Sequence, residues 1–314
     1  MKNKPIIITA GEPKSIFFEI FFKSIKLRKY QSPLVLIFNH KDFNKQMKRF
    51  KIKKRLRIIE IDNIKNIKLD NTKINLINID SQIKNEISRD YINKSFKVAF
   101  KLIKSNFTYK IINGPINKKK FFNKKFLGVT EYLANNFKKK VGMLIYNKEL
   151  SVCPLTTHLP VKQVAKKITK KLILEKVHII DIFYRKFLGY KPNIGVTGLN
   201  PHCESILKIN EDDKIIAPTI KHLKKKKFKI SGPFSADTIF LKNNRKKFDV
   251  ILGMYHDQVL TPVKTLFEYD AINITMGLPF LRVSPDHGPN EKMVGKNKSN
   301  PLSLIKALSF LDQR

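Results

Sequence analysis

Three of the seven histidines come directly after short, β-branched apolar stretches of the kind that form buried strands. His158 follows 151–155, His202 follows 194–199, and His256 follows 248–254. The carboxyl ends of neighbouring parallel strands meet at one edge of a sheet, where α/β proteins bind their ligands. Neutral imidazole is a preferred ligand of Zn²⁺, Co²⁺ and Ni²⁺, and three protein ligands leave a position open for substrate. For any one of these histidines alone a structural loop role is the commoner state, but their shared placement at strand ends makes a metal site about equally consistent with the pattern.

Groups that could hold an anion lie elsewhere in the chain. No G-x-G-x-x-G follows the first predicted strand and no Walker A sequence occurs, so a Rossmann or P-loop site is not indicated. The segments 11–15 and 232–238 could each bind phosphate at a helix start. Ordinary helix capping by Ser15 or Ser235 explains the same residues. Which of the two readings holds stays open from sequence alone.

Polar residues after His256 could bind a phosphorylated or carboxylated substrate. Lys264 precedes the predicted strand 272–275, Asn273 lies within it, and Arg282 follows it. The two cations could form charge-assisted hydrogen bonds with a carboxylate and a phosphate. A general base is not identified by any spacing, and Asp237 and Asp257 are candidates by position only.

Alternating strand-like and helix-like stretches predict an α/β fold with a largely parallel sheet. The residues 62–80 are low in complexity and receive no assignment. The expected strands are 5–9, 34–38, 57–61, 109–113, 141–146, 151–155, 194–199, 248–254 and 272–275. The expected helices are 15–26, 81–104, 161–187 and 302–311.

The composition is strongly basic, with 63 Lys and Arg against 25 Asp and Glu and a net charge of +38. Such a charge is typical of nucleic-acid-binding proteins. Here, however, lysine is spread along the whole chain together with Ile and Asn, so we favour a compositional bias over a nucleic-acid surface. The apolar runs are too short for a membrane-spanning helix or a signal peptide. The two cysteines, Cys153 and Cys203, cannot build a disulfide framework, and we expect a cytoplasmic protein.

Seven segments in a fixed order make the chain resemble the 4-hydroxythreonine-4-phosphate dehydrogenase family of pyridoxal phosphate (vitamin B6) biosynthesis. The resemblance covers essentially the whole length. The segments are ITAGEP (8–13), NGPINK (113–118), TEYLA (130–134), TTHLP (156–160), GLNPH (198–202), GPFSADT (232–238), and the stretch from MYHDQ (254–258) through NITMGLPF (273–280) to DHG (286–288).

The resemblance implies that His158, His202 and His256 bind a divalent metal, either Zn²⁺, Mg²⁺ or Co²⁺. It also implies that Thr130, Lys264, Asn273 and Arg282 contact the substrate. The implied fold has two α/β/α domains around a central cleft, as in the isocitrate and isopropylmalate dehydrogenases. We expect one domain to comprise 1–128 with 279–314 and the other 129–278. Family members are homodimers with active sites at the subunit interface, and they bind NAD or NADP without a Rossmann motif.

The activity implied is metal-dependent, NAD(P)-linked oxidation of 4-phosphooxy-L-threonine to a β-keto acid, which decarboxylates to 3-amino-2-oxopropyl phosphate. One departure bears on the substrate: Val129 replaces the histidine that usually precedes Thr130. Because valine cannot form a side-chain hydrogen bond, a phosphorylated sugar acid such as phosphothreonate or phosphoerythronate is an alternative substrate. A protein from a different class, a basic nucleic-acid-binding protein, is the weaker alternative.

Overall fold

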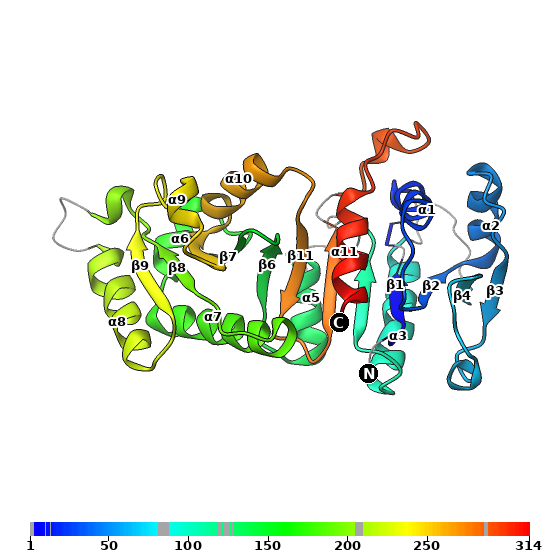
Figure 1. The fold of residues 1–314 in the computed structure, drawn as a ribbon, viewed down its shortest axis with the longest axis horizontal. Helices are drawn as coiled ribbons and strands as arrows, with labels where there is room; N and C mark the ends of the chain where they lie inside the picture. The colour runs from blue at the N-terminus through cyan, green and yellow to red at the C-terminus, as the bar shows by residue number, and fades with distance from the viewer. Residues whose placement is uncertain are drawn as a thin grey trace. The chain divides into compact units, whose positions relative to one another are not determined.

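The chain divides into two compact units, residues 1–132 with 279–314 (unit 1) and 133–278 (unit 2). The computed structural model describes residues 3–9, 11–12, 14–80, 88–117, 121, 126, 128–204, 210–285 and 288–314. The sequence analysis expected the second domain to begin at 129, four residues before unit 2 begins. Each unit contains its own run of strands with helices packed against it (Figure 1).

The strands of unit 1 are all parallel to their neighbours and follow the order β3-β4-β2-β1-β5-β12. Their central members are fully buried apolar runs, which explains why they are recognisable from sequence. The strands are β1 (Ile6–Thr9), β2 (Leu34–Phe38), β3 (Leu56–Ile59), β4 (Ile74–Asn78), β5 (Lys110–Asn113) and β12 (Leu281–Pro285).

Aromatic side chains fill the space between the unit 1 strands and their helices. Phe18, Phe38 and Phe43 are almost fully buried, and the rings of Phe18 and Phe38 meet edge to face at 4.4 Å. Helix α3 packs on β1 and β2, and α11 packs on β12, β1 and β5. The helices are α1 (Phe17–Leu27), α2 (His40–Arg49), α3 (Ser88–Lys104) and α11 (Leu302–Asp312).

The strands of unit 2 follow the order β11-β6-β7-β10-β8-β9. Strands β7, β10, β8 and β9 are parallel, whereas β6 pairs antiparallel with both β7 and β11. The expectation of a largely parallel sheet is therefore correct for unit 1 and for four adjacent strands of unit 2. The strands are β6 (Gly142–Tyr146), β7 (Ser151–Thr156), β8 (Ile194–Thr197), β9 (Ile230–Phe234), β10 (Val250–Tyr255) and β11 (Ile272–Met276).

Helices α7 and α10 both pack on β7, and α8 packs on β9 (Figure 1). The core between α10 and the sheet contains the buried side chains of Val152, Ile251, Val259 and Val263. The helices are α5 (Val129–Phe137), which leads into unit 2, and α6 (Val161–Lys167), α7 (Lys170–Phe183), α8 (Ala217–Lys225), α9 (Lys242–Arg245) and α10 (His256–Phe267).

Two sequence-based expectations need correction. The unassigned stretch 62–80 contains strand β4, whose buried Asn75 donates from its amide nitrogen to Leu34 O and Asp70 O. The helix expected over 161–187 breaks after α6, because Thr169 caps α7 by accepting from Leu172 N at 3.2 Å. The first part of the expected helix 81–104, residues 81–87, lies outside the described residues.

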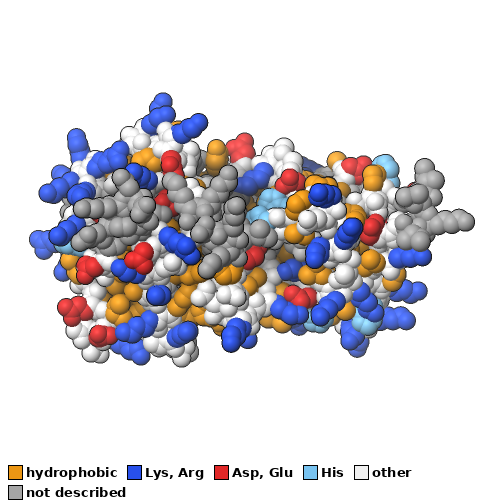
Figure 2. Space-filling model, turned by 180° about the vertical axis from the view of Figure 1, so that it is seen from behind, with side chains coloured by type: hydrophobic (Ala, Val, Ile, Leu, Met, Phe, Trp, Pro, Cys, Tyr) orange, Lys and Arg blue, Asp and Glu red, His pale blue; other side chains and the backbone are white. Residues whose placement is uncertain are grey.

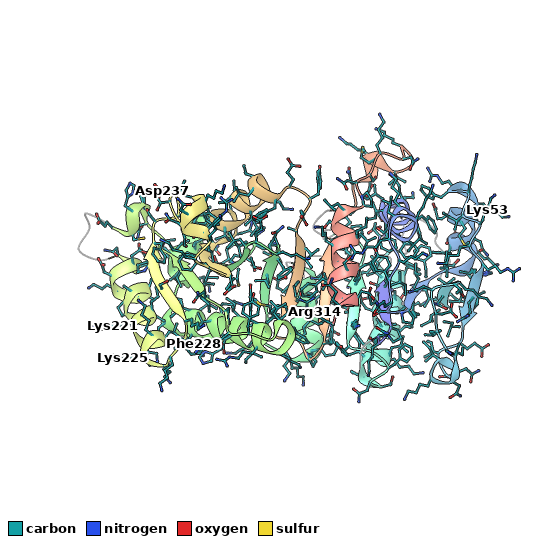
Figure 3. The ribbon with its side chains drawn as sticks, viewed as in Figure 1. Lys53, Lys221, Lys225, Phe228, Asp237 and Arg314 are labelled. Atoms are coloured by element: carbon teal, nitrogen blue, oxygen red, sulfur yellow. The ribbon has the colours of Figure 1, made fainter. Side chains whose placement is uncertain are left out.

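Charge is dispersed over the face of the molecule seen in Figure 2. Figure 2 shows Lys and Arg side chains scattered among hydrophobic and acidic ones on the face in view. Figure 3 places Lys221 and Lys225 of α8 at one end of unit 2 and Asp237, just after β9, at the opposite end. Within the described ranges, no helix combines the length and apolar character that crossing a membrane requires.

Candidate active site

The three histidines follow the carboxyl ends of three adjacent parallel strands, β7, β10 and β8, as the sequence predicts. His158 lies two residues beyond β7, His256 is the first residue of α10 directly after β10, and His202 lies in a short turn after β8. One sheet edge of unit 2 therefore presents all three side-chain positions.

The structure brings two of these histidines together. The ring centroids of His158 and His256 are 5.9 Å apart, with 36° between the ring planes. In the described part of the chain, no three His, Cys, Asp or Glu side chains come close enough to hold a metal ion, so His202 does not complete a three-ligand cluster. The three-histidine metal site thus stays a prediction, with two of its members adjacent.

Backbone strain marks two of the three positions. His158 has φ +54° and His202 has φ +56°, both in the left-handed region that non-glycine residues seldom adopt. A residue held there costs free energy that the surrounding structure must supply, and such residues cluster at functional sites. The strained pair at the same sheet edge supports a functional role for this edge.

The donor set agrees with a divalent metal in chemical type. His256 Nδ1 lies 2.6 Å from Asp257 Oδ1, which leaves His256 Nε2 for another partner. A carboxylate on the distal nitrogen is the usual arrangement for a metal-binding histidine, because it fixes the tautomer and the ring orientation. Asp257, one of the two candidate bases, therefore has a more specific role as the partner of His256. Asp237 is exposed after β9, and the identity of the base stays open.

A buried carboxylate that sequence reasoning missed holds the loop between β8 and His202. Asp212 is 0 % exposed and accepts hydrogen bonds from Leu199 N at 2.8 Å, Asn200 N at 3.0 Å and Asn200 Nδ2 at 2.8 Å. A charged side chain this deeply buried requires such partners. The Asp212 carboxylate therefore fixes the backbone of the loop that carries His202. Nothing in the sequence separates Asp212 from the neighbouring Asp213.

The expected substrate-binding residues lie on four elements. Thr130 is on α5, Lys264 on α10, Asn273 on β11 and Arg282 on β12. Asn273 is half-buried, and its Oδ1 atom is buried without a hydrogen-bond partner among the described residues. A buried amide oxygen of this kind is suited to accept from a ligand. Thr130 and Arg282 belong to unit 1 and the other two to unit 2, so their convergence on one substrate stays a prediction.

Arg282 is held in a fixed orientation by a residue that the sequence analysis did not single out. Its Nε donates to Asn113 Oδ1 at 2.7 Å, and the side chain is almost completely buried in unit 1. Burial lowers the pKa of the Arg282 guanidinium to about 9, while the Glu131 carboxylate opposes that shift. An anion bound beside Arg282 would stabilise its charged form. In the sequence Asn113 stands out as the last residue of the predicted strand 109–113 and the first of the segment NGPINK, and neither feature reveals its contact with Arg282.

The two proposed phosphate loops are used differently. Ser15 Oγ donates to Glu12 O at 2.7 Å and accepts from Phe17 N at 3.3 Å, so this side chain serves the local backbone at the start of α1. Gly11 has φ +70°, and a Cβ there would overlap Pro115 O. Ser235 precedes no helix and its buried Oγ has no partner among the described residues. Phosphate binding by either loop stays a prediction.

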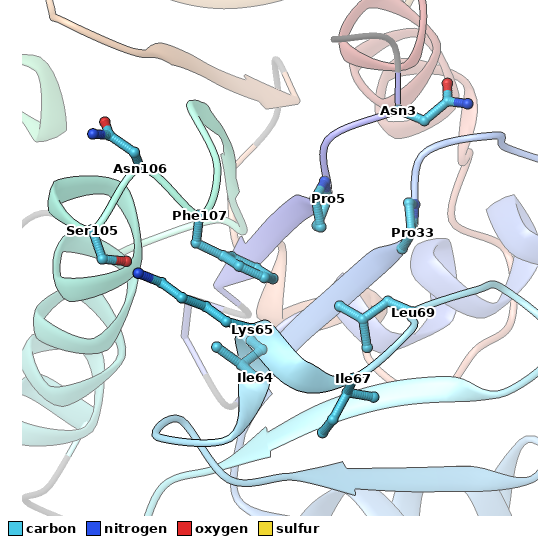
Figure 4. A pocket seen from close by; sticks show the side chains of 10 residues that line it. All are labelled: Asn3, Pro5, Pro33, Ile64, Lys65, Ile67, Leu69, Ser105, Asn106 and Phe107. Carbon is cyan, nitrogen blue, oxygen red and sulfur yellow. The ribbon is translucent and has the colours of Figure 1, made fainter.

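A separate hollow of about 430 Å³ lies at the amino ends of the unit 1 strands β1, β2 and β5 (Figure 4). Pro5 and Pro33, which line it, directly precede β1 and β2, and Phe107 precedes β5. α/β proteins place their active sites at the carboxyl ends of the strands. This hollow contains none of the predicted site residues.

Comparisons with known proteins agree over nearly the whole chain. The family model described as "Pyridoxal phosphate biosynthetic protein PdxA" matches residues 29–311. A 4-hydroxythreonine-4-phosphate dehydrogenase of Sulfurihydrogenibium sp. (strain YO3AOP1) is 36% identical over 97% of this chain and 96% of the relative. The crystal structure of the enzyme of that name from Klebsiella pneumoniae has a TM-score of 0.83 and 27% identity, covering 98% of both chains.

A more distant solved structure bears on the fold alone. The isocitrate dehydrogenase of Methylococcus capsulatus superposes with a TM-score of 0.50 at 12% identity, covering 100% of this chain and 86% of that one. The predicted isocitrate dehydrogenase-like α/β fold class is confirmed.

Proposed function

The chain belongs to the PdxA family of pyridoxal phosphate biosynthetic proteins, and we propose that it oxidises 4-phosphooxy-L-threonine with NAD or NADP. It is an oxidoreductase of the dehydrogenase type. The observation that carries the proposal is the His158–His256 pair at the carboxyl ends of β7 and β10. Within this pair, His256 Nδ1 contacts the Asp257 carboxylate. Two imidazoles at the sheet edge where α/β proteins bind ligands support a metal-dependent reaction at this place.

The proposed product is a β-keto acid that loses CO₂ to give 3-amino-2-oxopropyl phosphate. When bound, a divalent metal supplies Lewis acidity at the substrate hydroxyl and the nicotinamide ring accepts the hydride. His158, His202 and His256 would hold the metal, and Zn²⁺, Co²⁺ and Mg²⁺ are the candidates. Asp257 fixes the orientation of the His256 ring, so that Nε2 faces away from the carboxylate.

The remaining side chains bind and orient the substrate in this proposal. Arg282, fixed by Asn113, provides a rigid, buried positive charge for a phosphate or a carboxylate. Lys264 supplies a second positive charge from α10, eight residues after His256 on the same helix. Asn273 Oδ1 would accept a hydrogen bond from the substrate, and Thr130 would donate one from α5.

A phosphorylated sugar acid such as phosphothreonate or phosphoerythronate is the alternative substrate. The observation that favours it is Val129 at the first position of α5, directly before Thr130. A hydrogen bond that a histidine would give to the substrate is not available from valine. Loss of one such bond changes the preference between closely related substrates more than it changes the reaction type.

The test is NADH formation by the purified protein with 4-phosphooxy-L-threonine, after chelation and then with Zn²⁺, Co²⁺ or Mg²⁺. We expect turnover only when metal is restored. Turnover with phosphothreonate or phosphoerythronate instead would favour the alternative substrate. Absence of turnover with every substrate, together with absence of metal binding, would refute the proposal.

A homodimer with active sites at the subunit interface and a cytoplasmic location complete the proposal. The family resemblance supports the dimer, and the free thiols of Cys153 and Cys203 are compatible with a reducing compartment. Light scattering coupled to size-exclusion chromatography should give twice the chain mass. A monomer with full activity would contradict the shared active site.

Replacing Asp257 with asparagine should weaken metal binding by about 10–100-fold, because it removes the charge that polarises the metal-binding histidine. The side chain keeps its size, so the fold should be unaffected. Titration with Co²⁺ measures the change in affinity. The matched control is Glu149→Gln, which neutralises an exposed carboxylate in the same unit. Equal weakening in both variants would indicate a general charge effect and contradict the role of Asp257.

A further inference from the structure

We propose that Gln258 is a positioning residue that fixes the strand end carrying His202 relative to the strand end carrying His256, and thereby sets the metal affinity of the site. The inference rests on the proposed metal-dependent function. It concerns a side chain that lies two residues after His256 and touches none of the three imidazoles in the contacts described below.

Both amide atoms of Gln258 bond to the ends of two adjacent strands. Its Nε2 donates to Gly198 O, just beyond β8, at 2.8 Å. Its Oε1 accepts from Met254 N in β10 at 2.7 Å and from the Thr197 hydroxyl, the last residue of β8, at 2.8 Å. The side chain therefore joins the two strands with three hydrogen bonds, each of normal length.

These bonds begin where the backbone ladder between the strands ends. Strands β10 and β8 pair from Val250↔Ile194 to Leu252↔Val196 and no further. Met254 N and Gly198 O, which lie just beyond the last pair, both bond to the Gln258 amide instead. The Gln258 amide therefore lies between the ends of β8 and β10 and hydrogen-bonds to both. These bonds fix the distance between the two strand ends.

A glycine makes room for this bridge. Gly253 in β10 has no side chain, and a Cβ there would lie 3.1 Å from Gln258 Oε1 and would overlap Val259 Cγ1. Any larger residue at 253 would push the amide or the first turn of α10 away from the sheet. The sequence thus accommodates the inserted amide at the strand that leads to His256.

The other neighbour of β10 is held in a different way. Strand β7 stays paired with β10 as far as Tyr255↔Thr156, and the Thr156 hydroxyl donates to Met254 O at 2.8 Å. Backbone pairing that extends to the ends of both strands therefore fixes His158 relative to His256, which agrees with their ring separation of 5.9 Å. The amide of Gln258 plays the corresponding part for His202, so loss of Gln258 should act through His202.

The experiment compares Co²⁺ binding by the full-length wild-type protein, Gln258→Leu and Thr197→Val, using calorimetry and the visible absorption of bound Co²⁺. We expect Gln258→Leu to weaken Co²⁺ binding by about 10–100-fold, the range typical of outer partners of a metal site, and to alter the spectrum. Thr197→Val removes one of the three bonds, so its effect should be smaller and in the same direction. Gln163→Leu, on the exposed surface of α6, is the matched control and should bind as the wild type does.

A second comparison separates positioning from a general loss of structure. In a His202→Ala background, Gln258→Leu should cause no further loss of Co²⁺ affinity, because the residue through which it acts is gone. Full additivity of the two substitutions would overturn the inference. So would unchanged Co²⁺ binding by both Gln258→Leu and Thr197→Val while the wild type binds Co²⁺, and this result would leave the proposed function intact. A wild-type protein that binds no Co²⁺, Zn²⁺ or Mg²⁺ would overturn both.

Discussion

His158→Asn is expected to lower turnover with 4-phosphooxy-L-threonine by more than about 100-fold at saturating metal. Mutation of a residue that only hydrogen-bonds to a metal ligand already lowers metal affinity or activity by about 10–100-fold, and loss of a ligand itself should cost more. Asparagine tolerates the left-handed backbone better than most residues, so the φ of +54° at this position can be kept while the imidazole is lost. The measurement is the initial rate of NADH formation as a function of metal concentration.

The control for His158→Asn is His178→Asn. His178 is an exposed residue of α7 whose Nδ1 contacts Leu174 O within the helix, so its replacement should leave turnover unchanged. Retention of full turnover by His158→Asn would refute the assignment of His158 to the reaction. A loss of turnover that raised metal concentration restores would instead show that His158 contributes to affinity but is not essential.

The strands that form the centre of each unit could be predicted from sequence because they are buried on both faces. The run at 34–38 coincides with β2, and the run at 151–155 is one residue shorter than β7. Strands β4, β9 and β12 escaped detection, and polar residues interrupt β4 and β12. Asn75 in β4 and Arg282 in β12 are buried, and each donates to a partner distant in sequence, Leu34 O and Asn113 Oδ1 respectively. No local periodicity reports such partners.

The candidate site could be predicted as far as its strand ends, since a histidine directly after an apolar run is visible in a linear sequence. The residues that orient those histidines could not. Asp212 and Gln258 act through backbone atoms of other segments, at Leu199, Asn200 and Gly198. Their roles depend on which strands are neighbours, and strand order is a property of the fold. His202 shows the same limit, because its place at a strand end did not put it into a cluster with His158 and His256.

Arg282→Lys is expected to reduce the affinity for 4-phosphooxy-L-threonine by about 30-fold or more, since disturbing one partner of a buried charged pair costs about 2–5 kcal/mol. Lysine keeps the positive charge but loses the planar guanidinium that Asn113 Oδ1 orients through Nε at 2.7 Å. Calorimetric binding of the substrate without cofactor measures the change. Arg185→Lys, at an exposed arginine paired with Asp181, is the matched control and should bind normally.

The same arginine predicts how substrate binding by the wild-type protein depends on pH. Burial lowers the pKa of Arg282 to about 9, so we expect the guanidinium to stay charged below that pH and to begin losing its proton only above it. An anionic substrate binds to the charged form and should raise this pKa in the complex. Affinity should therefore be constant well below pH 9 and fall as the pH rises through 9. Binding that stays constant to pH 10 in calorimetric titrations would show that Arg282 keeps its proton throughout, or that the substrate anion lies elsewhere. The Arg282→Lys variant then decides between these two, because only a substrate bound at Arg282 is weakened by that substitution.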